Sequence, residues 1–510
     1  MSLLSVDETV EERCPVPENG APSPDLETTT PPKHLWAEQA AQVVAVAVLL
    51  AAPALLSFRG KSLSDPDTWW HLRTGEWILQ HHAVPHADTF SWTNAGKPWV
   101  AYSWLYELLV IKLFHWFGLP GILGYTAAML LCITAAVRRL IGRFQPDFLM
   151  VALFTLVGCF SFARIFTPRP WLFSILFFVL ELDILLRVRA TGRARKLAWL
   201  PVLFALWANI HIQFIDGLIV LGIAAAEVVA TRFGWGERTL LQPRALGLAI
   251  LGSFLGTLAN PSGLGIYRVA YDLASQAGVM NKIDELQAMH FRTTMDFLIL
   301  FIALGAAAAL AYGRRLRIFE TGMLVFAVLI SFRSVRDVWA VGIFGCVILA
   351  SAIRTKPRHP SAPLPRFGAA AAMAIAALIV VLGARVMRIS APSSESEVAS
   401  TMPVKAVEYI RAQGYPGPLY NTFDWGGYLI WALRMPVSVD GRAAFYGDPA
   451  LDRSVATWSG QPNWASDPQL KAAGIVIGPI NMPLVQFLRT DPHFQLAYED
   501  KVAAVFVARR

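Results

Sequence analysis

The sequence predicts a polytopic α-helical membrane protein with about eleven transmembrane helices and a small C-terminal α/β domain. Its 510 residues are 55% hydrophobic and only 16% charged, whereas soluble domains carry about 25% charged residues. The mean hydropathy of +0.47 requires many lipid-buried segments over this length. Apolar runs recur up to residue 387, after which the chain becomes polar. These observations exclude secreted, fibrous and disordered proteins, and proteins with a single membrane anchor.

Cysteines and charges narrow the class further. Cys14 lies in the N-terminal tail and Cys132, Cys159 and Cys346 lie in apolar runs, so they form no disulfide framework. The formal net charge of +8 is explained by basic cytoplasmic loops, as the positive-inside rule requires. No zinc-finger spacing or basic-aromatic stripe occurs, so nucleic acid is not an expected partner. Membrane lipid is an expected partner, because the chain has many apolar runs.

Three domains are predicted along the chain. Residues 1–33 are rich in Pro, Glu, Asp and Thr, a composition typical of a disordered tail, here cytoplasmic. A transmembrane domain follows over 34–388 and an extracytoplasmic domain over 389–510. The apolar runs that predict spans lie near 35–57, 119–140, 147–163, 168–187, 197–212, 214–231, 245–260, 296–312, 317–332, 337–353 and 367–387.

Clusters of basic residues give the orientation of the spans. If every cluster is cytoplasmic, every second loop is accounted for, the N-terminus is inside and the C-terminal domain is outside. By this parity the charged apolar run at 99–117 cannot span. It is predicted to be a juxtamembrane or re-entrant helix within a first outer loop at 58–118. The basic clusters lie within 138–143, 187–196, 232–244, 314–317 and 354–366.

The polar C-terminal segment has the pattern of a small α/β domain. Its motifs Asp424-Trp-Gly-Gly and Asp440-Gly441-Arg442 are typical of turns. The functional interpretation of these motifs is an acceptor-binding lid over the membrane site. Strands are predicted at 417–421, 436–440, 475–478 and 502–508, and helices at 403–413, 467–473 and 482–490.

The segment from Ser64 to His71 is the first candidate site. Asp65 followed by Pro66 is typical of a helix start, and Asp67 and His71 then share one helix face. Capping and helix-dipole interactions explain both carboxylates structurally. The functional interpretation is a general base or a metal ligand at the membrane surface. Because Asp65 has the better structural explanation, Asp67 is favoured as the catalytic residue.

Tryptophan is concentrated in the first outer loop. Seven of the 17 Trp residues lie between Trp69 and Trp116, where an interfacial aromatic belt explains some of them. Sugar rings also stack on aromatic faces, so Trp70, next to His71, is a candidate for substrate binding. The histidines of this loop match no standard zinc spacing.

Polar side chains also gather at the outer ends of later spans, where ionisable residues are functional candidates by default. Guanidinium groups suit phosphate because their donor fork is planar and always charged. The structural alternatives are snorkelling or pairing for the arginines, and interhelical hydrogen bonds for the others. The candidates are Arg164, Arg169, Asn209, His211, Arg333 and Arg336.

In their order along the chain, these motifs resemble the GT-C superfamily of membrane glycosyltransferases, which use polyprenyl-phosphate-linked sugars. The resemblance covers most of the chain from about residue 35. It is greatest to bacterial members of the kind that includes aminoarabinose transferase and protein O-mannosyltransferases. Those proteins have an acidic residue after the first span, a G-[DE]-W-I-like stretch, and a K-P-P-x-x-x-W-L-like helix ending in F-G. The matching residues are Asp65-Pro-Asp67, Gly75-Glu76-Trp77-Ile78, Lys97-Pro98-Trp99, Ser103-Trp104-Leu105 and Phe117-Gly118.

The resemblance implies juxtamembrane helices in the first outer loop and inverting sugar transfer to a hydroxyl of a lipid, glycan or protein. The reaction would occur at the outer face of the bacterial cytoplasmic membrane, with Asp67 or Asp65 as the base and the arginines and His211 near the leaving phosphate. Some members use a divalent metal, so Mg²⁺ or Mn²⁺ is the candidate cofactor. Trp99 replaces the second Pro of the family motif, and the distance from the acidic motif to Gly75 is shorter than in the aminoarabinose transferases. Both aspartates therefore stay open as the base.

Two other functional classes stay open. A secondary transporter or lipid flippase needs paired discontinuous helices and ionisable residues near the bilayer midplane, and the sequence shows neither in paired form. A non-catalytic envelope assembly protein with a periplasmic domain is the other class. Function retained in variants of both aspartates would favour it.

Overall fold

The computed structural model describes residues 33–59, 62–313, 316–353 and 364–509. The predicted tail, except for residue 33, lies outside the described residues, as do residues 314–315 and 354–363 of two predicted basic clusters. The chain divides into a unit of residues 1–42 and a unit of residues 43–510. The candidate site lies entirely in the second unit.

Each of the eleven predicted apolar runs contains a helix within the described residues. Among the described residues, six helices are long and apolar enough to cross a membrane: α1, α4, α8, α12, α14 and α15. Helices α5 and α7 have only 13 and 11 residues, so the count of eleven spans stays a prediction. The eleven helices are α1 (Lys33–Ser57), α4 (Leu119–Ile141), α5 (Phe148–Phe160), α6 (Trp171–Thr191), α7 (Leu200–Ile210), α8 (Phe214–Arg232), α9 (Pro243–Thr257), α12 (Thr294–Ala311), α13 (Ile318–Arg333), α14 (Trp339–Ala352) and α15 (Arg366–Val386).

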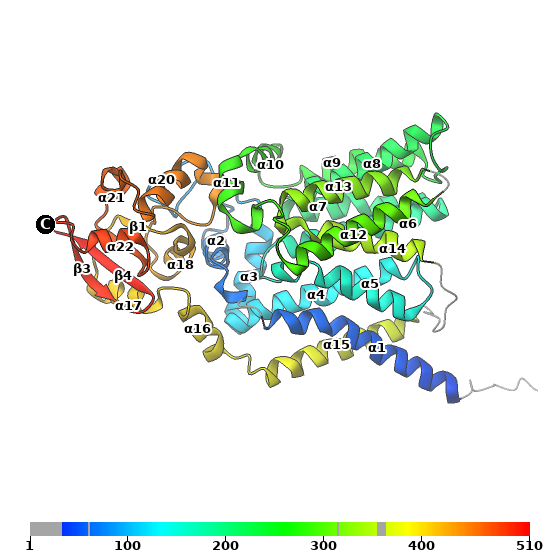
Figure 1. Cartoon of the computed structure of the whole chain (residues 1–510), viewed down its shortest axis with the longest axis horizontal. Helices are drawn as coiled ribbons and strands as arrows, with labels where there is room; N and C mark the ends of the chain where they lie inside the picture. The colour runs from blue at the N-terminus through cyan, green and yellow to red at the C-terminus, as the bar shows by residue number, and fades with distance from the viewer. Residues whose placement is uncertain (1–32, 60–61, 314–315, 354–363, 510) are drawn as a thin grey trace, which may run out of the picture. The chain divides into compact units, whose positions relative to one another are not determined.

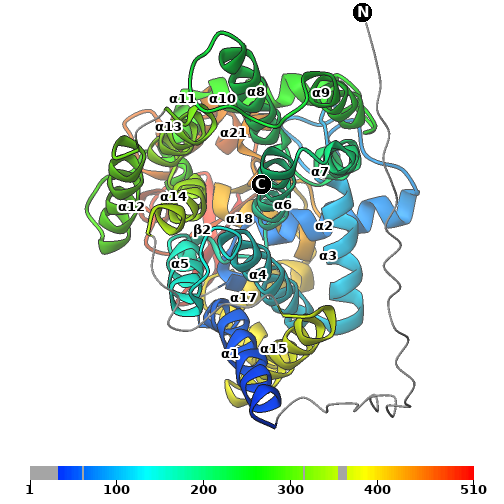
Figure 2. The same cartoon turned by 90° about the vertical axis from the view of Figure 1, so that its right-hand side faces the viewer.

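These helices form a bundle in which many neighbours in sequence are also neighbours in space. In both views α4 lies beside α5, and α15 lies beside the later part of α1 (Figures 1 and 2). The contact between α1 and α15 is close, because a Cβ placed on Gly383 would overlap the side chain of Leu55. Buried apolar side chains continue from this bundle into the C-terminal segment, so the two share one core.

The first outer segment holds η1 (Ser62–Ser64), α2 (Asp67–His81) and α3 (Trp104–Phe117). The predicted helix start at Asp65-Pro66 is correct to within two residues, because α2 begins at Asp67. The Asp65 carboxylate accepts the backbone N–H of Asp67 at 3.0 Å. The helix predicted within 99–117 is present as α3. It packs directly on α2, since a Cβ on Gly75 would overlap the carbonyl oxygen of Glu107. Its placement outside the hydrocarbon stays a prediction.

The C-terminal segment contains a four-stranded sheet of order β1-β2-β4-β3. Strands β1 and β2 are parallel, and the other pairs are antiparallel. Alternate residues of β2 enter two different cores, with Ile475 and Ile477 on one face and Val476 on the other. The elements are α16 (Ala391–Ala399), α17 (Val404–Gln413), β1 (Leu419–Asn421), α18 (Phe423–Ala432), α19 (Ala443–Tyr446), α20 (Asp448–Trp458), η6 (Trp464–Ser466), α21 (Pro468–Lys471), β2 (Ile475–Pro479), α22 (Pro483–Leu488), β3 (Phe494–Glu499) and β4 (Ala503–Ala508).

One predicted strand is wrong. Residues 436–440 form no strand, and Val437 makes only isolated bridges with Ser91 and Leu419. Pro436 has no N–H to donate, and the N–H of Ser438 is taken by the Asn421 side chain at 2.9 Å. Strand β3 and helices α16, α18, α19 and α20 were not predicted.

Candidate functional site

A cavity of about 510 Å³ opens beside the predicted aspartate motif. Its walls come from α2, from the segment that leads into α3, from the turn before α6, from α10 (Gly265–Ser275) with the segment after it, and from residues 441–445 of the C-terminal segment. Residues more than 350 positions apart therefore meet at one site. Six predicted site residues line it: Asp67, Trp70, His71, Arg169, His211 and Arg336.

Arg169 joins the two aspartates of the motif. Its backbone carbonyl accepts the hydroxyl of Tyr125 at 3.0 Å, which fixes the turn before α6. Its Nε donates to Asp65 Oδ2 at 2.7 Å, and its Nη1 donates to Asp67 Oδ2. A third carboxylate oxygen, Glu285 Oε1, lies 3.9 Å from Nη2. The arginine that was predicted to bind phosphate is thus surrounded by carboxylates.

Asp65 and Asp67 have different surroundings. The Asp65 carboxylate receives the first N–H of α2, whereas Asp67 lines the cavity. Gly441 lies directly against Asp67, and a Cβ at Gly441 would overlap Asp67 Oδ1. Burial raises the pKa of Asp67 to about 7, although the charge of Arg169 acts in the opposite direction. Asp67 is therefore the carboxylate placed to exchange a proton with a group in the cavity near neutral pH.

A second buried pair lies one turn along α2. His71 Nδ1 and Glu107 Oε1 are 3.2 Å apart, with 3% and 1% of their side-chain surfaces exposed. Burial lowers the pKa of His71 well below its usual value and raises the pKa of Glu107 well above its own, which favours the neutral forms of both groups, joined by a hydrogen bond. The Trp70 ring covers the imidazole at a centroid distance of 3.6 Å. Glu107 was missed as a site residue; its only signal was a carboxylate in an otherwise apolar run.

Arg442 is the charged residue that the C-terminal segment contributes to the wall of the larger cavity. Its Nη2 lies 2.8 Å from Asp88 Oδ1 and 2.7 Å from Asp440 Oδ2. Its guanidinium carbon is 4.5 Å from the centroid of the Trp99 ring and 5.0 Å from that of Phe445. The Asp440-Gly441-Arg442 turn therefore forms one wall of the cavity, and the interpretation as turn chemistry alone is incomplete.

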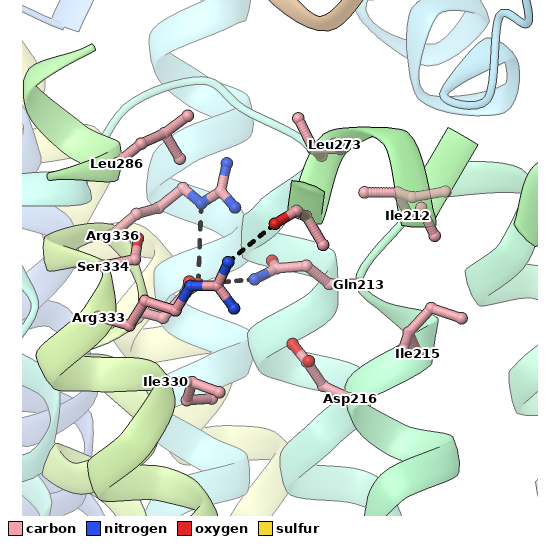
Figure 3. A pocket seen from close by; sticks show the side chains of 13 residues that line it. Ile212, Gln213, Ile215, Asp216, Leu273, Leu286, Ile330, Arg333, Ser334 and Arg336 are labelled. Atoms are coloured by element: carbon pink, nitrogen blue, oxygen red, sulfur yellow. Dashed lines mark hydrogen bonds and ion pairs between the residues drawn. The ribbon is translucent and has the colours of Figure 1, made fainter. Parts of the chain in front are cut away.

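A smaller cavity of about 190 Å³ adjoins the first and shares Leu273, Leu286 and Arg336 with it. Figure 3 shows Arg333 and Arg336 on one side of this cavity, and Gln213 on the other. Arg333 Nη2 donates to a backbone carbonyl of α10 at 2.8 Å. Arg336 Nε lies 3.7 Å from Asp337 Oδ1, so the predicted pairing of these neighbours is present.

The remaining predicted residues have structural partners. His211 lines the larger cavity, and its Nδ1 is 2.8 Å from Ser174 Oγ. Asn209 is an interhelical hydrogen-bond partner, since its side chain accepts Trp104 Nε1–H at 2.8 Å. Arg164 is 3.4 Å from Asp296. Asn209 and Arg164 line neither of the two cavities described.

The residues present do not fit the divalent metal site that the resemblance implied. Within the part of the chain that the structure describes, no three His, Cys, Asp or Glu side chains form a group that could hold a metal ion. The carboxylates of Asp65, Asp67 and Glu285 surround Arg169 instead.

Comparison with known proteins bears on the fold. No family model and no curated protein matches the sequence, but solved structures match the coordinates. The oligosaccharyltransferase AglB from Archaeoglobus fulgidus, in complex with an inhibitory peptide and a dolichol-phosphate, has a TM-score of 0.55 at 12% identity, over 86% of this chain and 69% of that chain. The apo form of the Archaeoglobus fulgidus oligosaccharyltransferase has a TM-score of 0.51 at 12% identity, over 85% of this chain and 69% of that chain.

The chain therefore shares the fold of these oligosaccharyltransferase structures. The predicted resemblance is thus confirmed at the level of the fold, and the six long apolar helices in the described part of the chain agree with the predicted multi-pass membrane protein. ArnT from Cupriavidus metallidurans bound to undecaprenyl phosphate also matches, over 93% of this chain and 98% of that chain, at 14% identity and a TM-score of 0.45.

Proposed function

We propose that the chain is a glycosyltransferase that moves a sugar from a polyprenyl-phosphate-linked donor to an acceptor hydroxyl. The observation that carries this proposal is Asp67, a buried carboxylate on the wall of a large cavity, within a fold shared with an oligosaccharyltransferase solved with dolichol-phosphate. With eleven spans and a cytoplasmic N-terminus, the cavity and the C-terminal domain lie at the outer face of a bacterial cytoplasmic membrane.

We assign the donor phosphate to Arg336 and Arg333. Arg336 borders both cavities, so a phosphate beside it is next to the sugar in the larger cavity and to the apolar walls of the smaller one. The smaller cavity is lined by Ile212, Ile215 and Ile330, side chains that suit the first isoprene unit of a lipid carrier. Arg169 is less suited to phosphate because three carboxylates surround it.

The chemistry follows from these positions. Asp67 takes the proton of the acceptor hydroxyl as that oxygen attacks the anomeric carbon. The bond between that carbon and the phosphate oxygen breaks, and the phosphate leaves with the electron pair, which inverts the anomeric configuration. Negative charge grows on the leaving phosphate, so fixed cations such as Arg336 lower the barrier. Trp70 and Trp99 offer aromatic faces to the sugar within the same cavity.

Analysis of lipid-linked sugars in a deletion strain tests this function. Loss of the enzyme blocks consumption of the donor, so a polyprenyl-phosphate sugar is expected to accumulate, and the wild-type gene is expected to clear it. Asp67→Asn is expected not to clear it, whereas Asp65→Asn retains part of the activity because Asp65 holds Arg169 without facing the cavity.

Glu395→Gln is the matched control, since Glu395 is an exposed carboxylate on α16 outside both cavities. Full complementation by the Asp67 and Asp65 variants, at normal protein levels, would contradict the proposal and favour a transporter or an assembly protein.

A further inference from the structure

The Arg169 guanidinium occupies the centre of an acidic cluster formed by Asp65, Asp67 and Glu285. Its three nitrogen atoms each approach a different carboxylate: Nε that of Asp65 at 2.7 Å, Nη1 that of Asp67, and Nη2 that of Glu285 at 3.9 Å. An arginine side chain has five N–H donors in one plane and no acceptor. One side chain can therefore satisfy several carboxylates at once, as a polyvalent cation would.

The guanidinium is held from other directions as well. Only 10% of its side-chain surface is exposed, and its carbon lies 5.0 Å from the centroid of the Trp171 ring. The backbone of Arg169 is fixed by Tyr125 and by an N–H donated to Thr167 at 2.8 Å. The positive charge is thus a permanent part of the fold.

This arrangement leaves no place for a divalent ion between the facing Oδ2 atoms of Asp65 and Asp67. Mg²⁺ needs oxygen ligands at about 2.0–2.1 Å in near-octahedral geometry. The oxygens that would supply them, Oδ2 of Asp65 and Oδ2 of Asp67, already accept hydrogen bonds from Arg169. A metal ion bound to these atoms would also lie within a few ångströms of the guanidinium, where two like charges repel strongly in a buried site.

We propose that Arg169 takes the place of a divalent metal in this site, so that the protein transfers sugar without one. This inference rests on the proposed function and deepens it. Arg169 acts as a positioning residue: it holds Oδ2 of Asp67, so that Oδ1, which lies against Gly441 at the cavity wall, is the atom presented to the acceptor. It also balances charge among three neighbouring carboxylates, which would otherwise repel one another.

The proposal predicts an unusual gain of metal dependence. Wild-type protein in proteoliposomes is expected to keep its transfer activity in excess EDTA. Arg169→Ala exposes three carboxylates to an empty space, and its activity is expected to fall about 100-fold. Guanidinium chloride or Mn²⁺ at millimolar concentration is expected to restore part of that activity, and Arg169→Lys is expected to retain part of it without addition.

Metal binding provides a readout that does not require activity. Mn²⁺ is expected to leave the melting temperature of the wild-type protein unchanged and to raise that of Arg169→Ala. Arg489→Ala is the matched control, since Arg489 is also an ion-paired arginine, with Glu499 as its partner, and lines neither cavity. This variant is expected to behave as the wild type in both assays.

Two results would overturn the proposal. One is a wild-type activity that EDTA abolishes and Mg²⁺ or Mn²⁺ restores; the other is Mn²⁺ stabilisation of the wild type that Asp67→Asn removes. If Arg169→Ala does not fold, the EDTA and Mn²⁺ measurements on the wild type and on Arg169→Lys still decide the matter. Absence of sugar transfer under every condition would contradict the proposed function instead, and the Mn²⁺ measurement would still test the metal inference.

Discussion

At the scale of single residues, Asp65 and Asp67 show how two carboxylates in one motif acquire different tasks. The Asp65 carboxylate accepts hydrogen bonds from the first N–H of α2 and from Nε of Arg169. Both of its oxygens therefore have a structural role. Asp67 shares the same arginine but lies on the cavity wall beside Gly441. Burial of this second carboxylate is what makes it a candidate base near neutral pH.

The pH dependence of the reaction follows from that burial. Because the pKa of Asp67 is raised to about 7, the carboxylate that can accept a proton is present above that pH and is lost below it. We expect kcat/KM to rise about tenfold per pH unit below the pKa and to level off above it. A profile of kcat/KM against pH checks this, and a midpoint near the usual carboxyl pKa would contradict it.

Gly441 provides a sharper test of the cavity wall. A Cβ in Gly441→Ala would overlap Asp67 Oδ1 and come within 3.1 Å of Trp70 Nε1, so Asp67 must move. We expect at least about a tenfold loss of kcat with little change in thermal stability, since small misplacements of a reacting group are costly. Gly247→Ala in α9, where the added Cβ meets nothing within 4 Å, is expected to leave kcat unchanged. Equal activities of the two variants would contradict the assigned geometry.

Site residues could be predicted from the sequence where the short spacing between polar residues already indicates a chemical role. The spacing of Asp65, Asp67 and His71 indicated a helix start with two groups on one face, and six predicted residues line the larger cavity. Glu107 was missed, and Arg442 was singled out only as part of a turn motif, because their importance comes from partners 36 and 354 positions away, His71 and Asp88. A single sequence carries no signal for such tertiary pairs.

At the scale of elements, the contact between α2 and α3 organises the site. The two helices approach closely at Gly75, and the His71–Glu107 hydrogen bond joins them inside the contact. Burial favours the neutral forms of both groups, and a neutral pair avoids the cost of burying two charges. This explains how a carboxylate can sit at zero exposure in α3.

The neutrality of Glu107 is testable by substitution. Glu107→Gln preserves the shape and the hydrogen bond of a protonated carboxyl, so we expect its melting temperature to stay close to that of the wild type. Glu107→Ala leaves His71 Nδ1 without this partner and opens a void, which is expected to cost about 2–4 kcal/mol. Thermal unfolding in detergent compares the two. Equal destabilisation by both variants would indicate that Glu107 is charged.

Helices formed from long apolar runs were predicted more accurately than the elements of the polar C-terminal segment. Apolar runs placed all eleven bundle helices, because burial in hydrocarbon demands continuous hydrophobicity. Residues 436–440 have a strand-like alternation, yet Pro436 and the Asn421–Ser438 hydrogen bonds prevent pairing. Strand β3 was missed although Phe494, Leu496 and Tyr498 alternate with less apolar residues. Five of its six residues are exposed or half-buried.

At the scale of the whole molecule, the C-terminal segment completes the cavity. Helix α18 lies against α2, where a Cβ on Gly427 would come within 2.7 Å of the Pro66 carbonyl oxygen. Arg434, which follows α18, donates from Nη2 to Glu76 Oε1 of α2 at 2.9 Å. A lid that only visits the membrane site would not need such close packing, so we infer that this segment is a fixed wall.

Arg442 is expected to hold that wall in place. Arg442→Met removes the ion pairs to Asp88 and Asp440 and leaves two buried carboxylates without a cation, a loss of about 3–5 kcal/mol. We expect faster hydrogen exchange in both the 86–99 loop and the 438–446 segment. Arg453→Met on α20, whose pair with Asp467 is 4.0 Å long and whose side chain is 40% exposed, is the control. Unchanged exchange in Arg442→Met would mean that the wall is held by other contacts.

The central claim is that this chain moves a sugar from a lipid phosphate with Asp67 as the base. The most direct test is transfer from a radiolabelled polyprenyl-phosphate sugar by the full-length protein in proteoliposomes with a membrane extract as the source of acceptor. We expect wild-type protein to release polyprenyl phosphate and to label the acceptor in equal amounts. We expect Asp67→Asn to lower both rates by about 100-fold or more. Equal rates for folded Asp67→Asn and wild-type protein would contradict it.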